Sequence, residues 1–182
     1  LKEKYKPNIN YLIYYPSIYD MKNRKSQNSV NIKLKKMSYF IPYEKDGNPQ
    51  DSLISKTDVL DYDYTGNFDI QYYKKDLLIL NMMGYYYPLG AAHGMPSMKT
   101  PSIDLVTGKF YTLGDLFMGG VYWTSELDKI IEKIIETDPE YSYVFKGSFK
   151  GINMNQDFYV DDNNLYIYFP PYEIGPYSAG FI

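Results

Sequence analysis

The sequence predicts an α+β fold, in which an antiparallel sheet carries helices packed on one face. β-Rich runs recur along the chain, several are paired across short turn sequences, and one stretch has a clear helical apolar stripe. With 45% hydrophobic and 23% charged residues, the composition is typical of a globular domain. A length of 182 residues fits a single compact unit, 1–182, made of two closely associated halves, 1–95 and 96–182.

The first half is expected to begin with a strand followed by a helix. Residues 11–15 are a β-rich run that ends at Pro16. Three apolar residues then recur at helical spacing after Met21: Val30, Leu34 and Met37. The alternation of apolar residues across 30–34 fits a strand equally well, so we predict the helix and keep the strand as the alternative.

Two turn-rich stretches separate the strands that follow. Residues 44–49 have the composition of an exposed loop, and Gly66 with Asn67 is expected to interrupt the chain again before the alternating run 68–72. The long apolar run 77–87 has the features of a central strand.

The second half is predicted to contain two hairpins and one helix between them. The hairpins are residues 103–111, with the tip at Thr107 and Gly108, and residues 158–169, with the turn at 161–164. Residues 124–137 carry the apolar stripe of an amphipathic helix, which ends before Pro139. Either Thr124 or Ser125 is the expected N-cap of this helix.

The composition disfavours several classes of function. A formal charge of -3 and an isoelectric point near 5.2 argue against a nucleic-acid partner. No apolar run approaches the ~20 residues that span a bilayer, so no transmembrane segment is expected within this sequence. The absence of cysteine removes disulfides, thiolate metal sites and cysteine nucleophiles. No glycine pattern fits a nucleotide site, and we expect no cofactor.

The only histidine, His93, limits the catalytic sites that can exist. A Ser/His/Asp arrangement could be drawn from Ser97 or Ser102 with Asp104, but the sequence has no Gly-x-Ser-x-Gly motif. We therefore expect no catalytic residues. The favoured role of His93 is structural, with its imidazole hydrogen-bonded inside the turn 90–94.

Two acidic stretches could be drawn as ion sites. Asp58, Asp61 and Asp63, with Asp69 nearby, are dense enough for calcium or for a glycosidase pair, but the EF-hand spacing is absent. The turn 161–164 could likewise be drawn as a calcium loop. We favour a solvated loop for the first stretch and a hairpin turn for the second, and we expect no metal.

Tyrosine is unusually abundant, with 23 residues against nine phenylalanines. Tyrosine is enriched at binding surfaces and stacks on sugars. Codon bias and strand propensity account for its scatter along the chain without any function, and we favour that second interpretation.

Several motifs nevertheless occur together in one order. They are the turn 90–94 after Tyr87, the segments 103–109 and 113–117, the run 158–169, and Pro171-Tyr172-Glu173-Ile174-Gly175-Pro176-Tyr177 with Ala179-Gly180. In combination they resemble a bacterial extracytoplasmic domain of unknown function (DUF3298-like), found in RsiV-type anti-sigma factors and in PdaC-type peptidoglycan deacetylases. Residues 15–18, with Asn23 and Gln27, resemble the companion domain that precedes it (DUF4163-like).

The resemblance implies a location outside the membrane, secreted or anchored at the cell surface through a segment not included here. In RsiV-type proteins the domain binds lysozyme, whereas in the deacetylases the chemistry belongs to another domain. We therefore expect a non-catalytic binding or sensing domain for a lysozyme-like protein or for a cell-wall (peptidoglycan) glycan. The candidate ligand-binding residues are His93, Tyr87, Tyr172 and Tyr177.

Two alternatives stay open, a cell-wall hydrolase or deacetylase (catalytic or accessory) and a structural spacer of a larger surface protein. The sequence also departs from the family pattern, which has a second glycine where Ala91 stands. We expect Ala91 to have ordinary backbone angles, because a positive φ would cost alanine about 1 kcal/mol.

Overall fold

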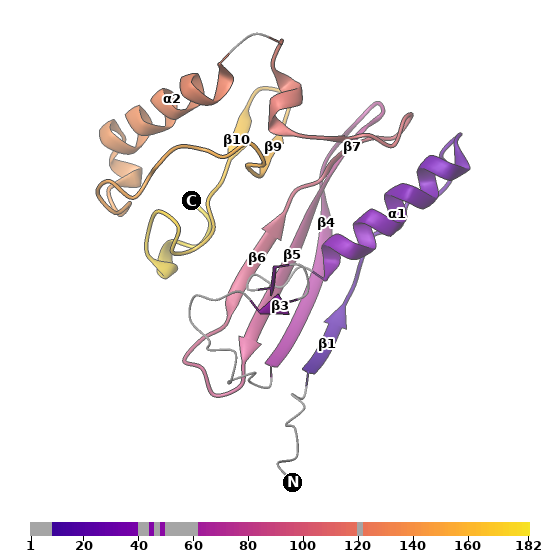
Figure 1. Cartoon of the computed structure of the whole chain (residues 1–182), viewed down its shortest axis with the longest axis horizontal. Coiled ribbons are helices and arrows are strands. Elements are labelled where there is room, and N and C mark those ends of the chain that lie inside the picture. The colour runs from indigo at the N-terminus through magenta and orange to yellow at the C-terminus, as the bar shows by residue number, and fades with distance from the viewer. Residues whose placement is uncertain (1–8, 40–43, 46–47, 50–61, 120–121) are drawn as a thin grey trace. The chain divides into compact units, whose positions relative to one another are not determined.

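The computed structural model describes residues 9–39, 44–45, 48–49, 62–119 and 122–182 (Figure 1). The chain forms two compact units, which we call the N-terminal unit (residues 1–69 and 81–99) and the C-terminal unit (residues 70–80 and 100–182). The sequence division at residue 95 stays a prediction.

The fold is α+β, as predicted, and the described residues form two α-helices and a mixed, mostly antiparallel sheet. β5 is the central strand and pairs with β4, β6 and β7. The described elements are β1 (Ile9–Ile13), α1 (Arg24–Ser38), β2 (Glu44–Lys45), β3 (Asn48–Pro49), β4 (Tyr62–Lys74), β5 (Leu77–Pro88), β6 (Met95–Lys99), β7 (Ser102–Asp104), β8 (Phe110–Tyr111), η1 (Leu113–Leu116), α2 (Trp123–Thr137), η2 (Pro139–Tyr141), β9 (Phe158–Val160), β10 (Leu165–Ile167) and η3 (Tyr177–Ala179).

The predicted antiparallel sheet contains one parallel pair, at its first strand. β1 runs parallel to β4, in a register from Ile9 opposite Tyr62 to Ile13 opposite Gly66. The chain passes through α1 between these two strands, and such a crossover returns it in the same direction. The remaining pairs of the large sheet for which a register is known are antiparallel.

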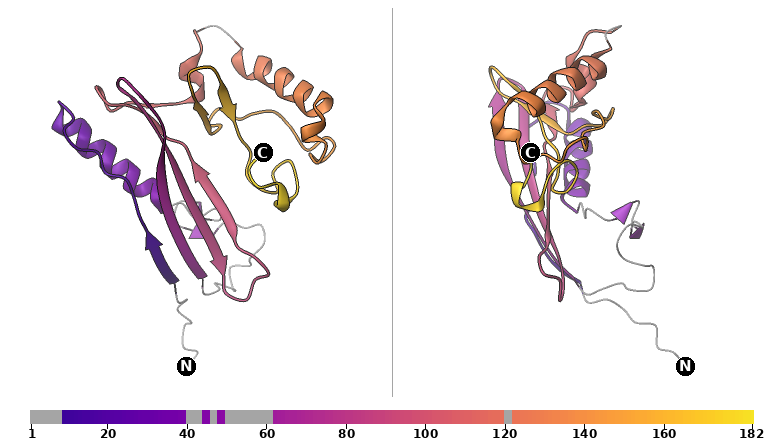
Figure 2. Two further views of the ribbon diagram at one scale, coloured as in Figure 1. Left: turned by 180° about the vertical axis from the view of Figure 1, so that it is seen from behind. Right: turned by 90° about the vertical axis from the view of Figure 1, so that its left-hand side faces the viewer.

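In the N-terminal unit, α1 packs against one face of the sheet (Figure 2). Val30 and Leu34 are 1% and 0% exposed. The Tyr64 hydroxyl donates to the carbonyl of Ser38 at the end of the helix. On the sheet, Tyr62, Tyr64 and Tyr86 form a buried cluster against which Ile13 packs. These contacts explain why helix prevails over strand in this segment.

The sequence prediction that Gly66 and Asn67 interrupt the chain is wrong, because both lie inside β4. A Cβ atom at position 66 would lie 3.2 Å from Cγ2 of Ile13. The glycine therefore allows the close approach of β1 rather than marking a turn.

The core of the C-terminal unit contains Ile79, Ile103 and Leu113, each at most 1% exposed. Both predicted hairpins are present. β7 and β8 are joined by a turn with Gly108 at a φ of 80°. β9 and β10 pair antiparallel, but beyond β10 Phe169 exchanges backbone hydrogen bonds with Ile182 instead.

α2 in the C-terminal unit ends at Thr137, before Pro139 as predicted, but it begins at Trp123, with Tyr122 as its N-cap. The predicted N-cap at Thr124 or Ser125 is wrong. The indole of Trp123 stacks on the ring of Phe117, with ring centroids 5.4 Å apart. This contact holds Trp123 in the first turn of the helix. Within the described part of the chain, no helix is long and apolar enough to cross a membrane.

Candidate ligand-binding surfaces

The turn 90–94, which follows β5, is held by hydrogen bonds from two predicted site residues, Tyr87 in β5 and His93 in the turn. The Tyr87 hydroxyl donates to the carbonyl of Ala91 at 3.0 Å. Nδ1 of His93 lies 3.0 Å from the carbonyl of Gly94, which can only accept, so this nitrogen is the donor. The amide of Gly94 donates to the Tyr85 hydroxyl at 2.9 Å. The imidazole is thus hydrogen-bonded within the turn, as its structural role requires.

The backbone of this turn depends on glycine at position 90, where φ is 87°. Ala91 is not among the described residues with a positive φ, which confirms the expectation for this position. Replacing the family's second glycine by alanine therefore leaves the turn unstrained.

The other two predicted site residues lie together in the C-terminal unit. The rings of Tyr172 and Tyr177 have centroids 5.6 Å apart and are tilted by 34°. Tyr172 is 53% exposed and has a φ of 71°, a left-handed conformation that is unfavourable for a tyrosine. Non-glycine residues held in such conformations cost about 1–3 kcal/mol and are concentrated at functional sites.

The loop that carries these rings, residues 170–177, is anchored by hydrogen bonds to residues 145–148. The carbonyl of Ile174 accepts from the amide of Phe145 at 2.9 Å and from the hydroxyl of Ser148 at 2.8 Å. Ile174 itself is 2% exposed. This anchoring keeps Tyr172 in its strained conformation.

Glu173 lies between the two tyrosines in the sequence. Burial raises the pKa of its carboxyl group, and the negative charge of Asp157 raises it further. Two carboxylates that repel each other favour the approach of a positive group. No motif in the sequence pairs residues 157 and 173, because only the fold brings them together.

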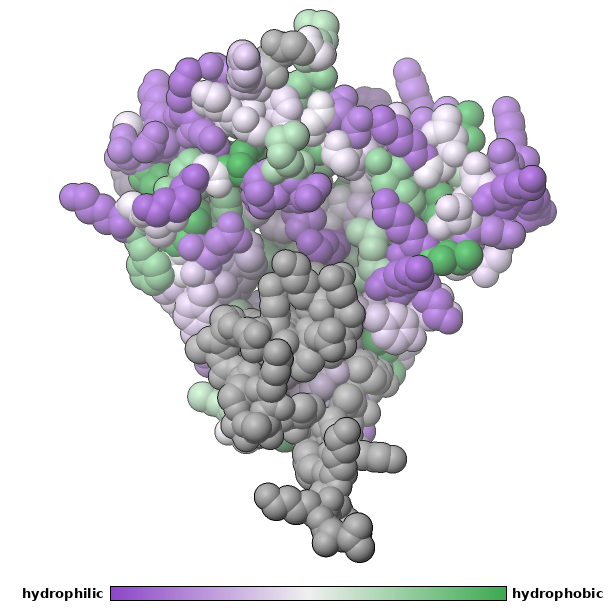
Figure 3. Space-filling view, viewed as in Figure 1, coloured by the Kyte–Doolittle hydropathy of each residue, from purple (hydrophilic) through white to green (hydrophobic). Residues whose placement is uncertain are grey.

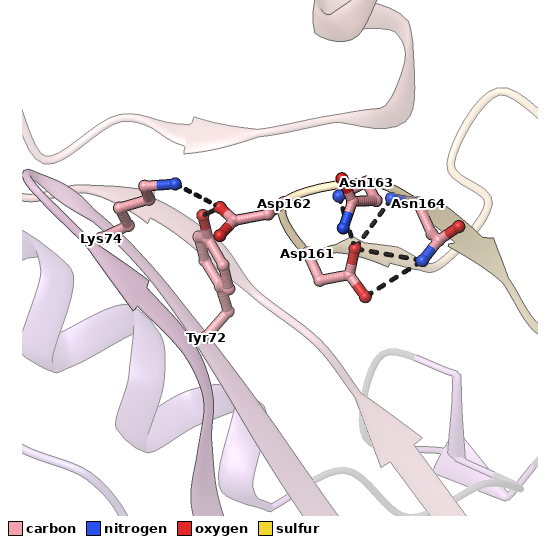
Figure 4. A network of polar contacts seen from close by, with 6 residues as sticks. All are labelled: Tyr72, Lys74, Asp161, Asp162, Asn163 and Asn164. Carbon is pink, nitrogen blue, oxygen red and sulfur yellow. Dashed lines mark hydrogen bonds and ion pairs between the residues drawn. The ribbon is translucent and has the colours of Figure 1, made fainter.

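The turn of the β9–β10 hairpin is closed by Asp161 (Figure 4). Its carboxylate accepts from the amides of Asn163 and Asn164, both at 2.8 Å, and from the Tyr166 hydroxyl at 2.8 Å. These hydrogen bonds, the one from Asn163 above all, lower the pKa of Asp161 to about 2. The Asp161 carboxylate thus accepts the hydrogen bonds that close the predicted hairpin turn.

The neighbouring Asp162 ties this turn to the end of β4. Its carboxylate accepts from the Tyr72 hydroxyl at 2.6 Å and from the ammonium group of Lys74, as Figure 4 shows. The described residues contain no group of three acidic or histidine side chains that could hold a metal ion. Of the other acidic stretch, Asp58 and Asp61 lie outside the described residues, and Asp63 accepts from Asn10 at 2.7 Å.

The carboxylate considered for a catalytic triad, Asp104, is used by the turn between β7 and β8. It accepts from the amides of Val106 and Thr107 at 2.8 and 3.0 Å, and from the Tyr111 hydroxyl at 3.3 Å. The Ser102 hydroxyl is buried and has no hydrogen-bond partner among the residues that the structure describes. These contacts give Asp104 a clear structural role.

A shallow pocket in the N-terminal unit lies between α1, β4, β5 and β6. Its volume of about 240 Å³ includes open solvent. Pockets for small-molecule ligands usually enclose roughly 300–1,000 Å³. An exposed surface is therefore a better candidate for ligand binding than this pocket.

The C-terminal motifs match the model of a known family. Residues 114–182 match the model of a family described as protein of unknown function (DUF3298). This segment is similar to the DUF3298 family. The Tyr172–Tyr177 loop lies within it, and the resemblance inferred from the motifs is confirmed at the level of this family. The more specific likeness to RsiV-type and PdaC-type proteins stays a prediction.

Two solved structures share the fold. A DUF3298 family member from Bacteroides fragilis NCTC 9343 is 18% identical, with a TM-score of 0.56 over 87% of this chain and 59% of that one. A DUF3298 protein from Pseudomonas aeruginosa PAO1 is 16% identical, with a TM-score of 0.53 over 66% of this chain and 56% of that one. This chain thus spans less than two thirds of either relative. No curated protein matches the sequence.

Proposed function

We propose that this chain is an extracytoplasmic, non-catalytic binding domain, whose recognition surface is the Tyr172–Tyr177 loop of the DUF3298 segment. The observation that carries the proposal is the exposed Tyr172 ring, held in a left-handed conformation on an anchored loop. Strain of this kind persists only where the surrounding structure enforces it, and it commonly accompanies ligand binding. A rigid aromatic side chain also binds at a low cost in conformational entropy.

The ligand we propose is a basic, lysozyme-like protein. The loop brings aromatic rings together with the carboxyl group of Glu173, whose pKa is raised by burial and by the negative charge of Asp157. An arginine or lysine of the partner could contact both carboxylates and the face of Tyr172. The overall charge of -3 favours association with a basic protein as well.

A cell-wall glycan is the second candidate, supported by the Tyr172–Tyr177 ring pair alone. Sugars stack on exposed tyrosines, and this contact needs no carboxylate. The two candidates therefore differ in their dependence on Glu173 and on salt.

Titration calorimetry with a basic lysozyme, at low and at moderate salt, tests the first candidate. We expect binding that weakens with salt, and an affinity at least about tenfold lower for Tyr172→Asn. Asparagine tolerates the left-handed conformation, so this variant removes the ring and keeps the loop. Tyr122→Ala is the matched control, because Tyr122 is 86% exposed in the same unit.

Absence of heat at high micromolar concentrations would exclude the lysozyme-like ligand. Binding of soluble peptidoglycan fragments that is unaffected by salt and by Glu173→Gln would support the glycan instead. Release of products from peptidoglycan would contradict a non-catalytic role.

A further inference from the structure

Positive charge is concentrated in one region of this acidic protein. Residues 14–39 contain six basic residues and one acidic residue, whereas the rest of the chain contains thirteen basic and twenty-one acidic residues. The six are Lys22, Arg24, Lys25, Lys33, Lys35 and Lys36. A charge summed over the whole chain conceals this region.

The basic side chains of this region are exposed on the surface of the folded protein. α1 places Gln27, Val30, Leu34 and Ser38 in the interior. At 100° per residue, Lys25 and Lys36 therefore fall on the opposite side, and Arg24, Lys33 and Lys35 fall on the two flanks. All five basic residues of the helix are exposed. Ile32 lies among them, 59% exposed, on the same side as Lys25 and Lys36. Figure 3 shows hydrophilic residues over α1, on the right of the view, with hydrophobic ones between them.

The segment that precedes the helix is held beside it and adds exposed tyrosines. The amide side chain of Asn31 accepts from the amide of Ile18 at 2.8 Å and donates to its carbonyl at 2.9 Å. The ammonium group of Lys35 lies 5.2 Å from the centroid of the Tyr15 ring. Tyr15 and Tyr19 are 40% and 72% exposed. Cationic and aromatic side chains thus form one ordered surface.

We propose that this surface, the outer face of α1 with residues 14–22, docks on an anionic lipid bilayer. Lysine and arginine near such a surface are attracted by its negative potential. Tyrosine side chains favour the interface between headgroups and acyl chains, and an exposed isoleucine gains from shallow insertion there. A soluble polyanion would use the charges but would gain little from Ile32 and the tyrosines. Docking by α1 is independent of the ligand proposed for Tyr172.

Sedimentation with vesicles tests this proposal. The protein is expected to sediment with vesicles of phosphatidylcholine and phosphatidylglycerol, to be released by high salt, and to stay in solution with phosphatidylcholine alone. The double variant Lys25→Glu/Lys36→Glu should lower partitioning by about tenfold or more. Ile32→Asn should cause a smaller loss.

The matched control is Lys146→Glu/Lys150→Glu, which makes the same change in net charge at two exposed positions of the C-terminal unit. It should partition like the unmodified protein. Folding of the α1 variant can be checked by circular dichroism. Its two glutamates have opposite effects on the helix, since one lies in the first turn and the other in the last.

Three results would overturn the proposal. The first is no sedimentation with the anionic vesicles at low salt. The second is an equal loss in the control variant, which would make net charge the sole cause. The third is binding of inorganic polyphosphate at least as tight as binding of vesicles, with no effect of Ile32→Asn, which would indicate a site for any polyanion.

Discussion

α1 and α2 have the same length, 15 residues, yet the protein uses them differently. α1 buries Val30 and Leu34 almost completely, whereas α2 has no buried side chain, and Ile130 and Ile134 are 54% and 41% exposed. In the sequence, α2 nevertheless has the clearer apolar stripe. Periodicity therefore indicates that a helix forms, but not how much of its stripe the protein covers.

The elements that surround each helix explain the difference. α1 packs on a sheet, which offers a broad apolar face next to the cluster of Tyr62, Tyr64 and Tyr86. α2 is held by individual contacts, such as the hydrogen bond from the amide of Ile152 to Asp128 at 2.8 Å and the stacking of Trp123 on Phe117. Such contacts fix a helix without covering its apolar side chains.

The largest expected difference is between two large-to-small substitutions. Leu34→Ala should lower the free energy of unfolding by about 2–5 kcal/mol, because it leaves a cavity under a helix that packs on the sheet. Ile134→Ala should cost less than about 1 kcal/mol, since this side chain is already 41% exposed. Urea denaturation of both variants measures the two values. Equal losses would mean that α2 is covered as well as α1.

A smaller difference is expected at the two N-caps. The side chain of Asn23 accepts from the amides of Lys25 and Ser26 at 2.9 and 3.1 Å, so Asn23→Ala should cost about 1 kcal/mol. Tyr122 makes no side-chain capping bond, and Tyr122→Ala should change stability by less than half of that. The same denaturation experiment compares them, and a larger loss at Tyr122 would contradict this assignment of the caps.

The smallest expected effect is on the pH dependence of stability, which should differ between the segments that precede α1 and α2. Before α2, hydrogen bonds from Lys109 first, and then from Thr112, lower the pKa of Asp115 from 3.8 to about 2. A lowered pKa in the folded state stabilises the protein fully above the unfolded value near 3.8, and this contribution disappears as the pH falls through about 2. The approach to α1 uses Asn23, which does not titrate.

Thermal melting between pH 6 and pH 2 tests this contrast. The melting temperature of Asp115→Asn should lie below that of the unmodified protein at pH 6, and the gap should close as the pH falls toward 2. The gap for Asn23→Ala should be independent of pH. A constant gap for Asp115→Asn would show that its carboxylate makes no net contribution.

Local chemistry made much of the fold predictable. Asp161 and Gly108 are turn residues whose side chain or backbone angle closes a hairpin without help from distant segments. The helix 124–137 and its end before Pro139 follow from periodicity and from the geometry of proline in the same way. Gly66 was misread because its role depends on Ile13, a residue far away in the sequence.

The candidate site was predictable only in part. Tyr172 and Tyr177 could be selected because they belong to one motif, and their rings do lie together. Nothing local reveals the left-handed conformation of Tyr172 or the proximity of Asp157 to Glu173. The basic residues of α1 can be read from the sequence, but their excess over acidic residues appears only when charge is counted segment by segment.

By itself, the sequence determined the fold class, the helix at 124–137, the two hairpin turns and the family resemblance of the C-terminal segment, because each depends on residues close together or on motifs in fixed order. The tertiary structure alone decided the parallel pairing of β1, the burial of α1 and the exposure of α2. It also decided which side chains surround Tyr172. These features depend on contacts between distant residues, and a pattern along the chain does not specify which surfaces will meet.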